Sequence, residues 1–471
     1  MKKWLEYGTG LLITSWVLIT CFAGLGDSPV RLWDESRQAM NTLEMLRSGN
    51  WAYTTFLGQP DFFNTKPPLL IWLQTASAGL FGMNTWALRL PSALAVLGAC
   101  LLLWFHLRAK PWQAMASIGA LIASAYCGYH TGRTGDYDAL LAFFLLLSLL
   151  SAVQWAEQEH LPAVWILPAA TALAFFTKSV AGLLFVPGIG LFLLLEGKLI
   201  HLLRRRTFWF SLLLSAACVA GWYLLHEKLS PGYLQAVWNN EFAGRIAASA
   251  EAHTGLWWFY AAYIHEKGFL LWLPAIIGLL LQYRKSVLAR AAFLCGLVFM
   301  VMISISATKI EWYANPVYPI LALGYGLLCQ TFVQRWKAGA AWVCIAAIGV
   351  IWWLQVWPEI RTAPGTVQPG PEDELSLFLQ SDSAMRKLNE GWAIVQGDYS
   401  PLLLFYNEQL FDRSGKRFPL RYADKVQAGE RVLVWHEAHL NRIRSQYRDS
   451  LIGKVDHLHW LEIGLAHDSI P

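Results

Sequence analysis

The residues that could carry out chemistry are acids and bases placed beside long apolar runs. The stretch Leu32–Leu70 begins with the adjacent carboxylates of Asp34 and Glu35 and ends just after Lys66. Between them, Ser36–Ser48 has apolar residues on one face, which predicts an amphipathic helix at a membrane surface. A structural interpretation is also open, because Asp34 can cap this helix and Lys66 can extend toward lipid headgroups.

Further acids and bases occur at the ends of later apolar runs. They are Arg133, Asp136, Asp138, Lys178, Glu241, Arg245, His253 and Lys309, and Tyr313 joins them. A single charge in such a place is usually an interfacial anchor. Several charges predicted on one side of a membrane indicate an enzyme with its site at the outer boundary. Carboxylates there can deprotonate and orient a hydroxyl, and Lys and Arg can neutralise a phosphate leaving group.

The composition is that of a polytopic α-helical membrane protein. The chain has 471 residues, of which 56% are hydrophobic, too many for a soluble protein of this size. The net charge of +5 is spread over predicted cytosolic loops, so it gives no reason to expect nucleic acid as a partner. All seven cysteines fall in apolar runs, and we interpret them as small core residues without disulfides. Tyr7–Leu25 lacks a small-residue cleavage site and is interpreted as a retained span.

Hydrophobic runs predict eleven spans. They are residues 8–25, 88–107, 112–130, 139–156, 161–177, 180–196, 207–226, 268–283, 288–307, 314–332 and 338–357. The run Leu69–Phe81 is too short to cross a bilayer and is predicted to be interfacial or re-entrant. With that assignment, Lys and Arg clusters alternate as expected for a cytosolic N-terminus.

The segment after Pro358 begins with the Pro/Gly-rich linker TAPGTVQPGPEDE and continues with the strand-like runs WAIVQG and RVLVWH. We therefore predict a transmembrane domain over residues 1–357, whose first extracytoplasmic loop covers residues 26–87. A small extracytoplasmic α/β domain is predicted over residues 358–471.

This arrangement suits the transfer of a sugar from a lipid phosphate. An interfacial amphipathic helix fits a substrate with a lipid tail. No Gly-rich nucleotide loop is present, so a nucleotide-sugar donor is not expected. The predicted acceptor lies on the outer side of the membrane.

Several motifs resemble those of the polytopic GT-C glycosyltransferases. They are the DE pair of the first loop, KPPLLIWL, RLPSAL, TGRTGDYDALL, FTKSVAGL and KIEWYANPVYP. Over residues 1–335 the chain is similar to the protein O-mannosyltransferases and to the bacterial aminoarabinose transferases that modify lipid A (glycosyltransferase families 39 and 83). The resemblance implies a polyprenyl-phosphate donor such as undecaprenyl phosphate, inversion at the anomeric carbon, and a periplasmic glycan, lipid or protein as acceptor. It implies the bacterial inner membrane, with the site on the periplasmic side.

The resemblance also implies roles for particular residues. Asp34 matches an essential aspartate, Asp138 a second-loop acid, Lys66 a lysine near the donor phosphate, and Tyr313 an aromatic residue of a late outer turn. We predict Asp34 and Asp138 as catalytic residues. The predicted donor-binding residues are Lys66, Lys178, Arg133, Arg245, Lys309, Tyr313, Glu35 and Asp136.

The chain departs from the aminoarabinose transferases at three places, and the first two bear on a metal site. The aminoarabinose transferases have an acid, associated with a metal, where this chain has Thr65, and a Glu-His pair where it has Glu241-Phe242. Their Lys-Gly pair is Lys178-Ser179 here. We therefore expect no obligatory metal or other cofactor. Glu241 with His253 is the remaining candidate pair, although a hydrogen-bonded structural histidine is the alternative.

Two other functions compete with glycosyl transfer. A transporter or flippase of lipid-linked sugars would show ionisable residues near the midplane or inverted repeats, and the sequence shows neither. A membrane scaffold or sensor would leave the grouping of Asp34, Lys66 and Asp138 unexplained.

Overall fold

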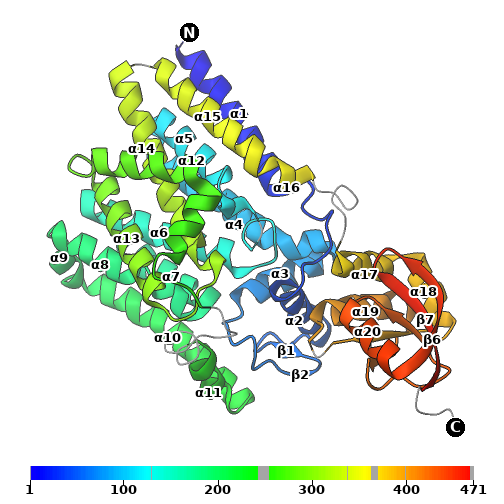
Figure 1. The fold of residues 1–471 in the computed structure, drawn as a ribbon. Helices are drawn as coiled ribbons and strands as arrows, with labels where there is room; N and C mark the ends of the chain where they lie inside the picture. The colour runs from blue at the N-terminus through cyan, green and yellow to red at the C-terminus, as the bar shows by residue number, and fades with distance from the viewer. Residues whose placement is uncertain are drawn as a thin grey trace. The chain divides into compact units, whose positions relative to one another are not determined.

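The computed structural model describes residues 2–128, 130–241, 254–336, 338–361, 370–397 and 399–466. Contacts between residues divide the chain into two compact units (Figure 1). The helical unit comprises Met1–Leu25 and Met45–Arg361, and the mixed unit comprises Gly26–Glu44 and Thr362–Pro471. Each unit is described by itself.

The helical unit is a bundle of apolar helices with short connections. Its longer helices are α1 (Lys2–Phe22), α3 (Leu69–Phe81), α4 (Thr85–Leu107), α5 (Pro111–Ile122), α6 (Tyr137–Gln158), α7 (Leu161–Lys178), α8 (Val186–Leu195), α10 (Arg206–Leu229), α12 (Phe259–Gln282), α13 (Val287–Ile305), α14 (Tyr318–Trp336) and α15 (Ala338–Gln355). Its short elements are β1 (Thr55–Phe56), β2 (Gln59–Pro60), η1 (Ala125–Cys127), η2 (Ser179–Leu183), α9 (Leu199–Leu203), α11 (Tyr233–Val237), η5 (Glu311–Val317) and α16 (Trp357–Arg361).

A helix overlaps each of the eleven predicted spans, and the multi-pass helical class is confirmed. Among the described residues, six helical segments are long and apolar enough to cross a membrane, and a bent pair within α12 makes up to seven. The bend of 110° lies at Gly268, whose backbone leaves the helical region. The count of eleven therefore stays a prediction. The short helix predicted at Leu69–Phe81 is α3, with those bounds.

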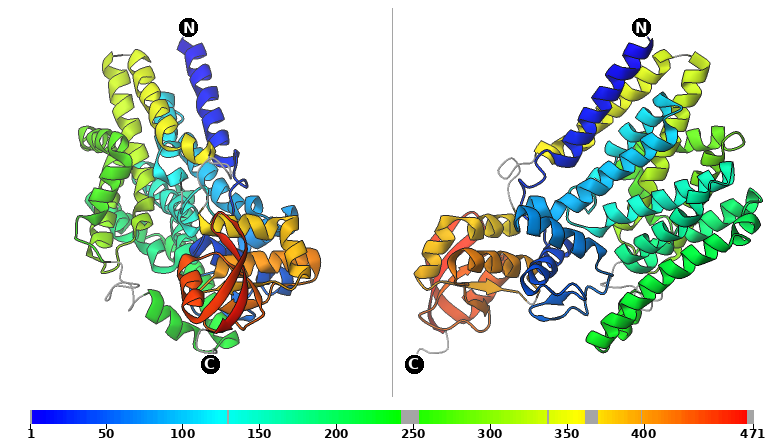
Figure 2. Two further views of the ribbon diagram at one scale, coloured as in Figure 1. Left: turned by 45° about the vertical axis from the view of Figure 1, so that its right-hand side comes forward. Right: turned by 180° about the vertical axis from the view of Figure 1, so that it is seen from behind.

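The first and last long helices of the unit lie side by side, as Figure 2 shows for α1 and α15. The rings of Trp16 and Trp352 stack with centroids 5.8 Å apart, and the indole N–H of Trp352 donates to Thr20 Oγ1 over 2.8 Å. Elsewhere small residues allow helices to approach closely. A Cβ at Gly278 of α12 would lie 2.0 Å from the carbonyl oxygen of Gly324 of α14, so neither helix tolerates a larger residue there.

Six of the seven cysteines are buried and none forms a disulfide, as predicted. The prediction was wrong for Cys218, whose side chain is exposed on α10. Only 11% of the apolar window of α10 is buried inside the protein. An apolar residue of a membrane protein need not be covered by protein, because lipid tails solvate it equally well.

The mixed unit contains a five-stranded sheet in the order β4-β3-β5-β7-β6. Its strands are β3 (Ala393–Gln396), β4 (Leu420–Tyr422), β5 (Arg431–Val434), β6 (Tyr447–Val455) and β7 (Leu458–Ala466), and its helices are α17 (Pro371–Gln380), α18 (Asp382–Asn389), α19 (Pro401–Ser414) and α20 (Glu437–Gln446). β3 runs parallel to β4 and β5, whereas β7 is antiparallel to β5 and β6. The predicted α/β class of this segment is confirmed, and its two predicted strands are β3 and β5.

An N-terminal segment completes the mixed unit. The predicted amphipathic helix forms as α2 (Asp34–Ser48). The backbone N–H of Val30 donates to the hydroxyl of Tyr406 over 2.8 Å, and the ring of Trp33 stacks on Tyr399 at 5.3 Å between centroids. The predicted boundary at residue 357 stays a prediction, and these contacts add that Gly26–Glu44 folds with the C-terminal segment.

Candidate active site

The loop before α6 is tightly packed and fixes where α6 begins. The backbone N–H of Gly132 donates to the carbonyl of Tyr126 over 3.1 Å, and the hydroxyl of Thr131 donates to the carbonyl of Ala125 over 3.0 Å. A Cβ at Gly132 would lie 2.5 Å from a methyl carbon of Val96, so this position has room only for glycine. The loop therefore holds the first residues of α6 in a defined place.

A buried ion pair joins α6 to α7. Lys178 Nζ lies 2.7 and 2.8 Å from the two carboxylate oxygens of Asp138. Asp138 is the second residue of α6 and Lys178 the last of α7, and the two helices form an antiparallel hairpin, so these ends meet. The residues are only 3% and 8% exposed. Each charge thus depends on the other for compensation, because isolated buried charges are costly.

Aromatic residues connect this ion pair to Lys66. Lys178 Nζ lies 5.3 Å from the centre of the Tyr313 ring, and Lys66 Nζ lies 5.5 Å from that of Tyr137. Both are within the range of cation–π attraction. The helical unit thus brings together Asp138 of α6, Lys178 of α7 and Tyr313 of η5. Lys66 lies beside Tyr137, the residue that directly precedes Asp138.

The loop that carries Lys66 is held by α10 and α11. The hydroxyl of Tyr233 donates to the carbonyl of Thr65 over 2.8 Å, and the indole N–H of Trp222 donates to the carbonyl of Ala52 over 3.0 Å. Burial raises the pKa of Tyr233, so the phenol keeps the proton that it donates. Lys66 is therefore attached to a loop with fixed ends while its own side chain stays half-buried.

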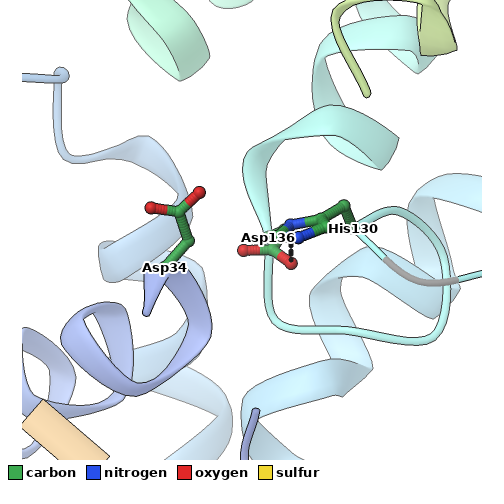
Figure 3. A group of neighbouring side chains, drawn as sticks. All are labelled: Asp34, His130 and Asp136. Carbon is green, nitrogen blue, oxygen red and sulfur yellow. Dashed lines mark ion pairs between the residues drawn. The ribbon is translucent and has the colours of Figure 1, made fainter. Parts of the chain in front are cut away.

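A second acid–base pair lies in the same unit and was missed by the sequence analysis. His130 Nδ1 lies 3.3 Å from a carboxylate oxygen of Asp136, and both residues are buried (Figure 3). The His130 ring also stacks on Trp312, with centroids 3.7 Å apart. The only signal in the sequence was a histidine six residues before an acid in one loop. Neither the pairing nor the stacking can be derived from that spacing.

Two predicted phosphate ligands have structural partners. The guanidinium of Arg133 donates to the carbonyls of Thr20 and Ala23, over 2.9 and 2.8 Å, at the end of α1. Lys309 Nζ donates to Ser304 O over 2.7 Å, and to two further carbonyls, those of Ile303 and Ser306, at the end of α13. An ammonium has three donors, so these carbonyls occupy all of them. Burial also lowers the pKa of Lys309. Both residues thus have structural roles at helix ends.

The remaining predicted residues lie elsewhere or outside the described residues. Arg245 and His253 belong to the range 242–253, which the structure does not describe. Asp34, drawn in Figure 3, is the first residue of α2 in the mixed unit and is partly exposed. Its neighbour Glu35 is buried, and a carboxylate oxygen accepts the backbone N–H of Arg31 over 2.7 Å.

Among the described residues, those at the position where related proteins have an acid do not form a metal site. The hydroxyl of Thr65 donates to a carboxylate oxygen of Glu241 over 3.2 Å. A neutral hydroxyl that is already donating is a poor ligand, and Glu241 alone supplies one carboxylate, whereas protein sites for divalent cations combine several charged or imidazole ligands. No step of the reaction is therefore derived through a metal at this position.

Comparisons with known proteins agree with this fold. The family model described as dolichyl-phosphate-mannose-protein mannosyltransferase matches residues 65–224. The undecaprenyl phosphate-alpha-4-amino-4-deoxy-L-arabinose arabinosyl transferase of Pseudomonas savastanoi pv. phaseolicola is 27% identical over 344 residues, which cover 71% of this chain and 63% of that protein. The matched region thus spans less than two thirds of this curated relative.

Two solved structures share the fold. ArnT from Cupriavidus metallidurans, bound to undecaprenyl phosphate, superposes with a TM-score of 0.75 at 16% identity, covering 98% of this chain and 99% of that one. An oligosaccharyltransferase from Archaeoglobus fulgidus gives a TM-score of 0.52 at 12% identity, covering 98% and 73%. The sequence matches and the shared fold together confirm that the chain resembles GT-C glycosyltransferases of the aminoarabinose-transferase and protein O-mannosyltransferase type.

Proposed function

We propose that this protein transfers a sugar from a polyprenyl-phosphate donor to an acceptor at the outer face of the bacterial inner membrane. The observation that carries the proposal is the buried Asp138–Lys178 pair, with Tyr313 beside Lys178 and with Lys66 beside Tyr137. The names of the relatives support it, because the curated one is a transferase of an undecaprenyl-phosphate-linked aminosugar. Lipid A or another periplasmic lipid, glycan or protein is the proposed class of acceptor.

The basic residues suit a phosphate leaving group. When the bond between the anomeric carbon and the phosphate oxygen breaks, negative charge grows on the lipid phosphate, and fixed cations lower the energy of that state. Lys66 supplies a half-buried ammonium on an anchored loop. The ammonium of Lys178 is held in place by two hydrogen bonds to Asp138. Placement before the reaction is what makes such charges effective.

We also propose the carboxylates as groups that orient the acceptor and the sugar. Asp138 retains the role inferred from the motif, orienting a hydroxyl while it positions Lys178. Asp34, at the start of α2, is proposed to orient the attacking hydroxyl or to accept its proton, on the ground of its match to the essential aspartate of the related enzymes. Attack from the face opposite the phosphate would invert the anomeric carbon.

The site is proposed to face the periplasm because the Lys and Arg clusters alternate as expected for a cytosolic N-terminus. Asp138 and Lys178 also lie at helix ends. Substrate sites of transporters, in contrast, lie near the middle of the membrane. A tag fused after the last residue should be labelled by a membrane-impermeant reagent in intact spheroplasts. Labelling only after lysis would place the tag in the cytosol and contradict the proposed orientation.

Transfer can be tested with purified protein in proteoliposomes. A synthetic polyprenyl-phosphate sugar and a lipid A acceptor should give a glycosylated lipid of inverted anomeric configuration, detected by mass spectrometry and NMR. The same donor carrying a fluorescent sugar tests for flipping in the absence of acceptor. Translocation without transfer to any lipid, glycan or protein acceptor would identify a flippase and refute the proposal.

A further inference from the structure

The buried carboxylate of Asp136 does not make its expected hydrogen bond. Asp136 is the residue before α6 and has extended backbone angles, φ −102° and ψ 164°. An aspartate in this position usually accepts a backbone N–H of the first helical turn. Here the side chain makes no capping bond, and neither carboxylate oxygen accepts a hydrogen bond from the described residues although Asp136 is only 3% exposed. Buried charged oxygens without donors are unusual.

His130 faces this carboxylate and is held from two sides. Its Nδ1 lies 3.3 Å from Asp136 Oδ2 (Figure 3), and its ring lies nearly parallel to that of Trp312, at an angle of 18°. The backbone of His130 is in the left-handed region, with φ 60°. A residue other than glycine rarely adopts it, and such conformations concentrate at functional sites. The ring orientation is therefore fixed by the loop and by the stacking.

The pair borders the candidate active site through two elements. Asp136 is two residues before Asp138, and Trp312 directly precedes Tyr313, which lies beside Lys178. Several other charged groups act on this region of the helical unit. They are Asp138 and Lys178 from α6 and α7, Arg133 from the same loop, and Glu359 of α16, whose carboxylate would meet a Cβ at Gly128 at 2.9 Å.

We propose that His130 and Asp136 form an acid–base dyad in which His130 accepts the proton of the acceptor hydroxyl. This inference rests on the proposed function. The acceptor oxygen forms a bond to the anomeric carbon, the bond from that carbon to the donor phosphate oxygen breaks, and its electron pair leaves with the lipid phosphate. The hydroxyl proton moves to His130 Nε2. The 3.3 Å approach of Nδ1 to Asp136 tightens to a hydrogen bond in the reacting complex, where Asp136 accepts Nδ1–H, fixes the tautomer and stabilises the imidazolium that forms.

A purely structural pair would leave the observations unexplained. Asp136 could cap α6 if it turned toward the helix, and instead it points at an imidazole whose backbone is strained. In the dyad, that arrangement places the carboxylate where it can stabilise the imidazolium. Asp34 then has the orienting role alone, and the proton has a destination within the helical unit.

The variants follow from the local backbone. His130→Asn keeps the left-handed conformation, which asparagine tolerates better than other residues. Asp136→Asn keeps a residue that caps helices equally well. His160→Asn is the matched control, because His160 is exposed at the start of α7 and makes no capping bond there. All should be compared in detergent by melting temperature and by KM for the donor.

We expect His130→Asn and Asp136→Asn each to lose about 100-fold or more of kcat, the range of general base catalysis, with melting and KM close to wild type. The double variant should be no slower than His130→Asn, because the two residues act as a unit. The wild-type rate should fall at acidic pH as the imidazole becomes protonated, and His130→Asn should lack this limb. An acidic limb that persists unchanged in His130→Asn would instead assign the proton to a carboxylate and overturn the dyad.

A readout that does not need activity separates this inference from the proposed function. Difference spectra of 15N-histidine-labelled wild type and His130→Asn should show the Nδ1–H tautomer for His130, and Asp136→Asn should lose that preference. If the protein transfers no sugar, the proposed function fails, whereas these spectra still test the pairing. Normal turnover in His130→Asn overturns the dyad. A metal requirement would also overturn the dyad. In that case a chelator would abolish wild-type activity, and Zn²⁺ or Mg²⁺ would restore it in wild type but not in Asp136→Asn, which would make the pair a cation site.

Discussion

Replacing Lys178 with methionine should destabilise the protein far more than replacing both partners of its ion pair. In Lys178→Met, Asp138 loses both bonds of 2.7 and 2.8 Å and remains only 3% exposed. Removing one partner of a buried pair costs about 3–5 kcal/mol, because the other charge is left uncompensated. The loss should fall toward the lower end, since both residues lie at helix ends where water can relax the site.

The double variant Asp138→Leu/Lys178→Met removes both charges and replaces them with apolar side chains. Such replacements are often neutral or stabilising, so its free energy of unfolding should return to within about 1 kcal/mol of wild type. The assay is thermal unfolding in detergent followed by tryptophan fluorescence, at one scan rate because unfolding of a membrane protein is often irreversible. Both variants should remain inactive in sugar transfer.

Each outcome tests one part of this reasoning. If Lys178→Met melts like wild type, the carboxylate of Asp138 is not held as a buried charge by Lys178. If the double variant recovers both stability and transfer, the pair is only structural and neither residue belongs to the active site. Arg290, near the start of α13, and Glu196, at the end of α8, provide the matched control. Their ion pair is more exposed than that of Asp138 and Lys178. Arg290→Met should lower stability by no more than about 1 kcal/mol.

Four further predictions concern the loops, α2 and a metal. Lys66→Ala should lower kcat by about 100-fold with normal expression, as loss of one fixed electrostatic donor does. Unchanged turnover, or poor expression alone, would show that Lys66 only anchors its loop. Tyr233→Phe leaves the buried carbonyl of Thr65 without its donor, so it should cost about 1–3 kcal/mol in unfolding, and equal melting temperatures would contradict that contact. Asp34→Asn should melt normally yet lose nearly all transfer in a turnover assay, whereas Glu35→Gln retains more. EDTA should leave wild-type transfer unchanged; a loss reversed by zinc would show that the metal prediction was wrong.

The positions of the helices could be predicted from hydrophobicity, but several of their ends could not, and two of these have a clear local cause. The run predicted as a span over residues 112–130 is helical only to Ile122, because the following loop satisfies its backbone through contacts such as Gly132 N–H to Tyr126 O. Irregular backbone at such a place is possible where protein covers it. Similarly, α8 begins at Val186 and not near residue 180, since Ser179 has φ 49° and interrupts the helix.

The candidate site was predictable where it depends on the ends of apolar runs. Asp138, Lys178 and Tyr313 lie together because hairpin helices bring their ends together, and that follows from span boundaries alone. The partners of Arg133 and Lys309 did not follow, because a basic residue near a span end has the same sequence pattern whether it binds a ligand or a helix terminus. The stacking of His130 on Trp312 depends on a left-handed backbone that no sequence pattern indicated.

The division of the chain has a consequence for the order in which its parts can fold during synthesis. Gly26–Glu44 leaves the ribosome early, but its partners Tyr399 and Tyr406 follow only after the whole helical unit has been made. At typical rates of 5–20 residues per second, the intervening segment takes about 20–60 s to synthesise. During that time α2 must remain unfolded, bind to the membrane surface or be protected by a chaperone. Nascent chains stopped before residue 399 should therefore expose α2 to protease even when every membrane helix is already inserted.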